Sequence, residues 1–235
     1  MRKAHGIFTA IFLIMLVMMG TSFADFFISI NIAPPALPVY VQPAPPAPNY
    51  IWTPGYWAYD SFFGDYYWVP GTWVAAPSPG LLWTPGYWHW SDGQYVYSEG
   101  YWGPHIGFYG GINYGYGYGG RGFSGGSWNN GVFIVNKTTN ITNVTNVTNI
   151  NNNTTSFNGG SGGTNAQPTP EEQAAMKEKH VPATSEQKKQ VQAARNNPAL
   201  RASANHGKPP IAATARPGVF KGKGGCGCQA SRIFL

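Results

Sequence analysis

The sequence predicts a mostly β protein: a small antiparallel meander of aromatic repeats, with a proline-rich N-terminal spacer and a largely disordered C-terminal half that carries one or two short helices. Three observations predict this class. A six-residue aromatic motif recurs within residues 51–135, and turn residues separate the aromatic and β-branched runs around it. The 235 residues include only 15 basic and 9 acidic ones, but 31 glycines and 20 prolines. This composition excludes one large packed domain, because it approaches that of low-complexity chains.

The first 24 residues have the three parts of a secretory signal peptide. Arg2 and Lys3 precede an apolar run over residues 7–19, and the pattern Ser22-Phe23-Ala24 follows it. The run is shorter than the ~20 residues that a helix needs to span a bilayer. An uncleaved N-terminal anchor is the alternative. We therefore expect cleavage after Ala24 and export to the periplasm, the outer membrane or the extracellular space.

Residues 25–50 form the proline-rich spacer. Prolines occupy positions 34, 35, 38, 43, 45, 46 and 48. Such a segment favours the extended polyproline II conformation, which forms without a partner and acts as a stiff spacer. The alternative is a recognition ligand for an aromatic groove.

The repeat module spans residues 51–135 and contains all nine tryptophans of the chain. The motif has three full copies and a fourth, degenerate one: Trp52-Thr-Pro-Gly55-Tyr-Trp57, Trp68-Val-Pro-Gly71-Thr-Trp73, Trp83-Thr-Pro-Gly86-Tyr-Trp88 and Tyr97-Ser-Glu-Gly100-Tyr-Trp102. Units this short cannot stand alone, so we expect them to build one core together. The fourth copy has Tyr97 in place of tryptophan and Glu99 in place of proline, which indicates an edge unit.

The Pro-Gly step inside each motif allows two interpretations. It could form a hairpin loop, but L-proline followed by glycine suits a type II turn, whereas hairpins favour the primed turns. We favour the other interpretation, a kink or bulge in a longer strand. A bulge of one residue would bring tryptophans five positions apart onto one face. In either case, we expect Gly55, Gly71, Gly86 and Gly100 to need backbone freedom that a β-carbon forbids.

Residues 100–126 alternate glycine with aromatic residues, and glycines recur every fourth position from Gly103 to Gly119. This spacing is typical of packed membrane helices. However, each glycine costs a helix about 1 kcal/mol, so we favour a Gly-aromatic loop or an irregular β layer.

The remainder divides into a low-complexity linker and a basic tail. Residues 136–167 are rich in Asn, Thr and Gly, and their apolar residues recur every three positions, which fits neither a helix nor a two-faced strand. An extended three-fold or stacked arrangement is the alternative. Residues 168–235 form a basic, weakly helical tail, since residues 136–235 hold twelve basic and four acidic residues.

Two capping boxes occur in this tail. Thr169 precedes Glu172 by three residues, and Thr184 precedes Gln187 in the same way. They predict helices over about residues 170–179 and 185–195, which are too short and alanine-rich to be stable alone. Farther on, Cys226-Gly-Cys228 cannot close an unstrained disulfide. Intermolecular bridging, metal capture and an unstructured end stay open.

The sequence offers no catalytic residues, metal site or cofactor site. The histidines are scattered without the convergent spacing that a metal needs. Asp60, Asp65, Asp92 and Glu99 could supply a glycosidase acid and base, but turn signals explain the aspartates more simply. We expect no nucleic-acid partner, because the basic charge of the tail is diffuse and the chain is exported.

The repeated Trp-x-Pro-Gly-x-Trp units, followed by the Gly-Tyr-rich sequence from Tyr101, resemble the YXWGXW (WXXGXW) repeat-containing family of exported bacterial proteins. The resemblance covers roughly residues 50–135. It implies export in a Gram-negative bacterium and no established molecular activity, and it transfers no catalytic residue.

These observations together predict a non-enzymatic structural protein of the cell envelope. The motif tryptophans (Trp52, Trp57, Trp68, Trp73, Trp83, Trp88 and Trp102) would form its core. Two alternatives stay open: a glycan-binding module that uses exposed Trp and Tyr rings, and outer-membrane association through residues 100–126. The expected partners are envelope polysaccharides or other envelope proteins, or the membrane surface. Buried motif tryptophans would favour the structural role, and exposed ones the glycan-binding role.

Overall fold

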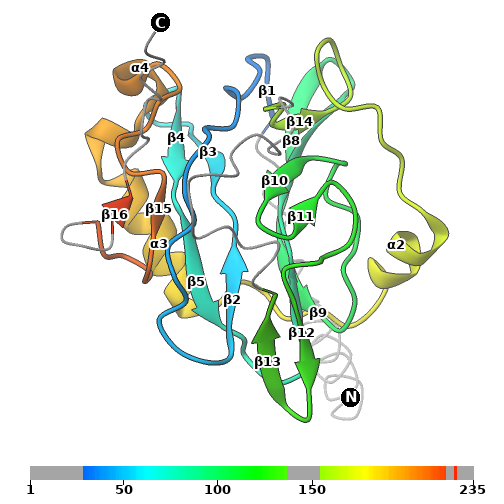
Figure 1. Ribbon diagram of the computed structural model, residues 1–235. Helices are drawn as coiled ribbons and strands as arrows, with labels where there is room; N and C mark the ends of the chain where they lie inside the picture. Colours follow the sequence, from blue (N-terminus) through cyan, green and yellow to red (C-terminus); the bar gives the residue numbers. More distant parts are fainter. Residues whose placement is uncertain (1–28, 137–153, 221–224, 227–235) are drawn as a thin grey trace, which may run out of the picture.

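The computed structural model describes residues 29–136, 154–220 and 225–226 (Figure 1). The signal peptide, most of the Asn/Thr-rich stretch, Cys228 and the side chain of Cys226 lie outside this described part. Within it, the protein is mostly β, with several small sheets and three α-helices. The predicted mostly β class is therefore confirmed.

The first hairpin contains two motif copies on its two long strands. Each strand is broken once, giving four pieces in chain order: β2 (Tyr50–Thr53), β3 (Tyr56–Asp60), β4 (Asp65–Val69) and β5 (Gly71–Ala75). The pieces pair as β2 with β5 and β3 with β4, all antiparallel. The Pro-Gly steps thus interrupt longer strands, and the loop lies between β3 and β4, as the favoured interpretation predicts.

The second hairpin repeats this plan with the third and fourth copies. Its pieces are β6 (Leu82–Thr84), β7 (Tyr87–Ser91), β8 (Gln94–Ser98) and β9 (Tyr101–Gly103). Here β6 pairs with β9 and β7 with β8. At the break, two unpaired residues of one strand lie opposite two unpaired residues of the other. The pairing register of the two strands is therefore the same before and after the break. The prediction of a one-residue bulge is wrong, because a bulge adds a residue to one strand only.

Segments from both ends of the chain extend these hairpins. The short strand β1 (Ser29–Ile30) pairs with β8, and β14 (Phe157–Asn158) lies parallel to β7. On the first hairpin, β15 (Ala213–Thr214) lies parallel to β5, and β16 (Gly225–Cys226) pairs with β15. The strand β1 contacts β8 only at Tyr95 and Val96, just before the fourth motif copy, but Trp102 within that copy forms a bridge with Val181. The outer side of the fourth copy is therefore partly covered, and it is not a free edge.

The proline-rich segment is extended but does not stand apart from the repeats. The indole N–H of Trp57 donates to the carbonyl oxygen of Ala36 at 3.0 Å, and that of Trp73 donates to Pro43 at 2.7 Å. Leu37 is buried in the same core. This segment therefore supplies backbone acceptors to the first hairpin.

The Gly-aromatic segment after β9 covers both hairpins. It contains the ribbon of β10 (Asn113–Gly115) and β11 (Tyr118–Gly119), and a second ribbon follows, formed by β12 (Gly126–Asn129) and β13 (Val132–Val135). The buried hydroxyl of Tyr118 lies 3.2 Å from the carbonyl oxygen of Trp52 and 2.9 Å from that of Trp83, one in each hairpin. The segment forms an irregular β layer, as expected, and contains no helix.

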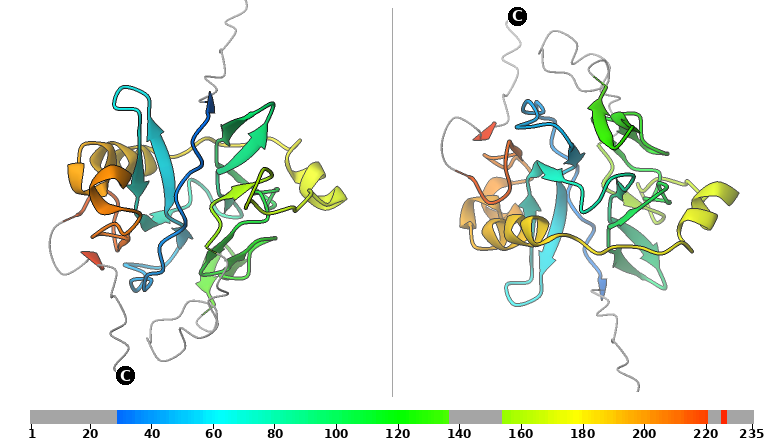
Figure 2. Two further views of the ribbon diagram at one scale, coloured as in Figure 1. Left: turned by 90° about the horizontal axis from the view of Figure 1, so that it is seen from above. Right: turned by 90° about the horizontal axis from the view of Figure 1, so that it is seen from below.

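The C-terminal part holds the helices α2 (Pro170–Ala175), α3 (Ser185–Arg195) and α4 (Ala202–Asn205), and a 3-10 turn η2 (Pro198–Leu200). Both predicted capping boxes are present, although α2 ends at Ala175. Figure 2 shows α3 and α4 beside the first hairpin and α2 beyond the second. No helix in the described ranges is long and apolar enough to cross a membrane.

The prediction of a largely disordered C-terminal half is wrong for residues 154–220. Ala194, Leu200 and Ala212 are fully buried. The Asp60 side chain, which is inaccessible to solvent, receives hydrogen bonds from Arg195 Nε at 3.0 Å and Arg195 Nη2 at 3.1 Å. Helices that are too short to be stable alone are thus stabilised by packing and by the ion pair of the exposed Arg195 with the buried Asp60 on the first hairpin.

Candidate functional site

The motif tryptophans form cross-strand aromatic pairs. Trp52 lies opposite Trp73 and Trp57 opposite Trp68, with ring centroids 5.4 and 5.3 Å apart. In the second hairpin the pairs are Trp83 with Trp102 (5.3 Å) and Trp88 with Tyr97 (5.1 Å). Tilted or edge-to-face pairs at these distances each add about 0.5–1.5 kcal/mol beyond their area burial.

These indoles are enclosed by the protein. None of the seven motif tryptophans is more than 9% exposed. The indole N–H of Trp88 donates to the carbonyl oxygen of Trp57 at 2.7 Å, which joins the two hairpins, and that of Trp68 donates to Ala212 at 3.0 Å. Since their faces are covered, these rings offer no platform for a sugar.

The motif glycines are required by close packing and not by backbone conformation. None of the four has a positive φ, so the expectation of special backbone freedom is wrong. A β-carbon on Gly55 would lie 2.8 Å from the backbone nitrogen of Gly71, and one on Gly71 would lie 2.5 Å from the ring of Trp52. Gly86 and Gly100 repeat this mutual approach. The Trp-x-Pro-Gly-x-Trp pattern therefore encodes two backbones that meet at the strand break, with a ring covering each glycine.

A cavity of about 480 Å³ lies where the two strand breaks meet, and α3 covers one side of it. Three motif prolines, Pro54, Pro70 and Pro85, line the cavity. The fourth equivalent position is Glu99, which lines the cavity as well. The degenerate copy thus places a carboxyl group where the other three copies place a pyrrolidine ring.

The aromatic wall of the cavity comes from both hairpins. Tyr56 and Tyr97 stack with their centroids 5.5 Å apart and their planes 12° apart. Tyr114 donates its hydroxyl to the carbonyl oxygen of Gly86 at 2.8 Å. Burial raises the pKa of the Tyr56 and Tyr97 hydroxyls well above the ordinary value, so both stay neutral at pH 7.

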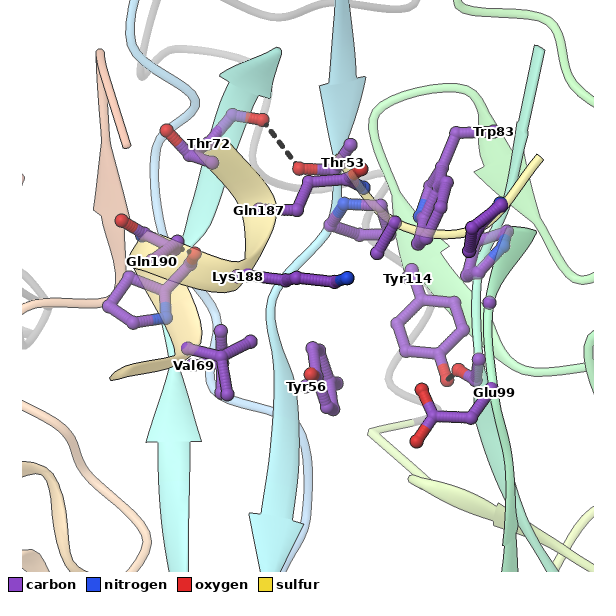
Figure 3. Close-up of a pocket in the computed structure, with 18 of the residues that line it drawn as sticks. Thr53, Tyr56, Val69, Thr72, Trp83, Glu99, Tyr114, Gln187, Lys188 and Gln190 are labelled. Atoms are coloured by element: carbon purple, nitrogen blue, oxygen red, sulfur yellow. Dashed lines mark hydrogen bonds between the residues drawn. The ribbon is translucent and has the colours of Figure 1, made fainter. Parts of the chain in front are cut away.

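Glu99 and Lys188 are the two charged residues among those that line the cavity. Figure 3 shows Lys188 reaching into it from α3 and Glu99 facing it from the second hairpin. Neither side chain forms an ion pair with a described residue. Both residues are exposed, although desolvation at the cavity wall raises the pKa of the Glu99 carboxyl.

The buried amides beside this cavity are committed to the fold. Gln187 Oε1 accepts from Trp102 Nε1 at 2.8 Å and from the N-cap nitrogen of Thr184 at 2.8 Å. Gln190 Nε2 donates to the carbonyl oxygen of Pro70 at 2.8 Å. These bonds fix α3 against both hairpins, and they leave Glu99 and Lys188 as the charged groups at the cavity that form no ion pair with a described residue.

The other carboxylates named from the sequence have separate roles. Asp60 faces Asp65 across β3 and β4, but the hydrogen bonds from Arg195 lower the pKa of Asp60. A glycosidase general acid needs a raised pKa. Asp65 accepts from the Ser203 hydroxyl at 2.6 Å. The structure therefore does not arrange this pair as acid and base.

The histidines are also apart. His180 stacks on Tyr101 with centroids 3.6 Å apart, whereas His105 contacts Glu178 at 2.8 Å. No group of three His, Cys, Asp or Glu side chains in the described ranges is arranged to hold a metal ion.

Paired, buried aromatic motifs on two hairpins define the chain as an aromatic-repeat β protein. A protein-family model described as the WXXGXW repeat matches the chain twice, at residues 48–74 and 79–102. The chain therefore carries two WXXGXW repeats, and the predicted resemblance is confirmed over these residues. Each family repeat corresponds to one whole hairpin with a motif on each strand. No curated protein and no solved structure matches the chain.

Sequence reasoning missed that the cavity exists and that Lys188 lines it, since no local pattern places α3 over the hairpins. The signal for Glu99 was visible, because it is the position where one copy departs from the proline of the other three.

Proposed function

We propose that the protein is a non-enzymatic structural protein of the cell envelope, in which the two WXXGXW hairpins form a rigid aromatic framework. The burial of all seven motif tryptophans carries this proposal. Each large aromatic side chain buries about 150–250 Å², which explains how short strands with few leucines and isoleucines form a core.

The N-terminal sequence supports export, and the resemblance supports a place in the envelope. In this proposal the N- and C-terminal segments stabilise the framework by adding strands to it. The strands β1 and β14 extend the second hairpin, and β15 extends the first. The partners are other envelope proteins or envelope polysaccharides at the outer surface, and contact with the membrane is peripheral.

A pair of tryptophans on one strand tests the framework. Trp88 is 2% exposed and Trp90 is 39% exposed, and both lie on β7. In the mature chain, residues 25–235, Trp88→Ala should lower the free energy of unfolding by about 3–5 kcal/mol and weaken the near-ultraviolet circular dichroism. Trp90→Ala, the matched control, should cost about 1 kcal/mol or less. Equal effects of the two substitutions would contradict the framework role.

Cell fractionation tests the location. The mature protein should appear in the envelope fraction, and a carbonate wash should release it if its contact with the membrane is peripheral. Retention in the cytoplasm would contradict export. Resistance to carbonate with release by detergent would contradict a peripheral contact.

A further inference from the structure

The cavity at the junction of the two repeats combines features that the framework role does not need. It is a partly open cavity lined by motif prolines, aromatic rings and one face of α3. Its volume of about 480 Å³ falls within the ~300–1,000 Å³ that is typical of small-molecule sites. Three of the four equivalent motif positions line it with proline, which is apolar and uncharged.

The fourth position departs from this pattern in a way that framework stability does not explain. Glu99 takes the place of a proline and brings a carboxyl group into surroundings that raise its pKa. A carboxylate without an ion-pair partner costs free energy when it is partly desolvated. A bound cation would offset this cost, and the stacked rings of Tyr56 and Tyr97 add a favourable environment for an ammonium group.

Lys188 supplies the complementary group on the other side. It extends from α3 into the cavity opposite Glu99 (Figure 3). The position of α3 is set by the buried bonds of Gln187 and Gln190 to the two hairpins. The cavity therefore has an acceptor for an ammonium group at one wall, a donor for a carboxylate at the other, and apolar surface between them.

We propose that this cavity binds a small zwitterion with an apolar part, namely a free amino acid or a short peptide with free termini. Glu99 receives the ammonium group beside the stacked tyrosines, and Lys188 receives the carboxylate. The apolar part lies against the motif prolines and Trp83. This binding goes beyond the framework role, and either one can fail without the other.

Calorimetric titration of the mature chain tests the proposal with four kinds of probe. The first is the series Phe, Ala-Phe and Ala-Ala-Phe, of which at least one member should bind. N-acetylation or C-terminal amidation of that member should each lower the affinity about tenfold or more, because each removes one charge. A neutral oligosaccharide is the fourth probe.

Substitutions assign the two charges. Glu99→Gln should lower the affinity for the unblocked peptide about tenfold, but should leave the affinity for the N-acetylated peptide nearly unchanged. Lys188→Gln should do the same with respect to the amidated peptide. Lys189→Gln is the matched control on α3, since Lys189 pairs with Glu186 and does not line the cavity.

Glu99→Pro keeps the test independent of folding, because it restores the motif proline of the other three copies. It should keep the near-ultraviolet spectrum and lose binding. Absence of binding by every zwitterion, binding of the oligosaccharide alone, or unchanged affinity in Glu99→Gln and Lys188→Gln would each overturn the proposal. An intact near-ultraviolet spectrum with no binding would leave the framework role standing.

Discussion

The two hairpins share one backbone plan, but the second contains the degenerate motif copy, in which Tyr97 replaces the first tryptophan and Glu99 replaces the proline. In the first hairpin both strands carry the full Trp-x-Pro-Gly-x-Trp motif, and the ring of the first tryptophan covers the glycine of the opposite strand. In the second hairpin the Tyr97 hydroxyl covers Gly86 instead. The break itself is retained in both, with paired glycines whose backbones meet. The comparison teaches that the glycines define the repeat, whereas the proline and the first tryptophan can be replaced.

The hairpins also differ in what holds them. The first is held by an ion pair, in which Arg195 and Arg201 contact the buried Asp60. Each hairpin is flanked by one parallel strand, β15 on the first and β14 on the second, but no strand residue of the second hairpin forms an ion pair with a described residue. The first hairpin therefore depends on charge more strongly than the second, and this difference can be tested.

The largest expected effect comes from the paired glycines. Gly55→Ala would place a β-carbon 2.8 Å from the backbone nitrogen of Gly71 and against the ring of Trp68, so neither neighbour can move freely. We expect a loss of about 3 kcal/mol or more in the free energy of unfolding, at the upper end for overpacking. Gly100→Ala should cost a similar amount if the second hairpin follows the same rule. Chemical denaturation followed by tryptophan fluorescence measures both.

Gly119→Ala is the control for these two substitutions. A β-carbon at Gly119 meets no atom within 4 Å, and its φ is not positive. Its effect should stay within about 0.5 kcal/mol. A Gly55→Ala variant as stable as Gly119→Ala would show that the backbones at the break are not in contact.

The next effect concerns the ion pair of the first hairpin. The hydrogen bonds from Arg195 lower the pKa of Asp60, so its carboxylate contributes stability that is complete above the ordinary pKa of about 3.9 and is lost as the pH falls through the lowered value. Asp60→Ala should cost about 1.5–3 kcal/mol at pH 7, because it removes the carboxylate that accepts charge-assisted hydrogen bonds from Arg195. Urea unfolding at pH 7 and pH 3 measures the difference.

The cost of Asp60→Ala should shrink at the lower pH, and Asp92→Ala, which removes no ion pair between described residues, is measured beside it at both pH values. Asp92 is the comparison because it lies in the loop of the second hairpin, where its carboxylate accepts a hydrogen bond from the neighbouring Ser91 and forms no ion pair with a described residue. An Asp60→Ala penalty that is the same at both pH values would contradict the electrostatic origin.

Much of the repeat could be predicted from sequence, because its signals are carried by residues that lie close together in the chain. L-proline followed by glycine suits a type II turn better than the primed turns of a tight hairpin, which favoured an interrupted strand over a hairpin loop. The capping boxes at Thr169 and Thr184 mark helix starts through bonds three residues apart. The long-range features had no such signal. Arg195 meets Asp60 across 135 positions, and a composition rich in glycine and alanine does not show which alanines become buried.

The candidate site divides in the same way. Glu99 could be noticed because it breaks a repeat, but the repeat alone suggested an edge strand. Only the packing of α3 and the stacking of Tyr56 on Tyr97 turn that departure into one wall of a cavity. The role of a residue that departs from a repeat therefore depends on the residues that pack opposite it in the fold.

The smallest expected effect makes the second hairpin more like the first. Glu99→Pro should raise the free energy of unfolding by about 0.5–1 kcal/mol, since proline restricts the unfolded chain at a position where three equivalent copies already hold it. The raised pKa of Glu99 adds a contribution that depends on pH, because ionisation costs stability above the folded pKa and nothing below the unfolded one. Glu99→Gln should therefore stabilise the protein only at pH values above the unfolded pKa of the glutamate, where its carboxyl ionises. Glu99→Pro should stabilise the protein at pH values both below and above this pKa. Thermal unfolding at pH 4 and pH 8 separates the two contributions. If both substitutions destabilise at pH 8, the carboxylate holds the second hairpin together, and the two hairpins differ in their framework and not only in their cavity.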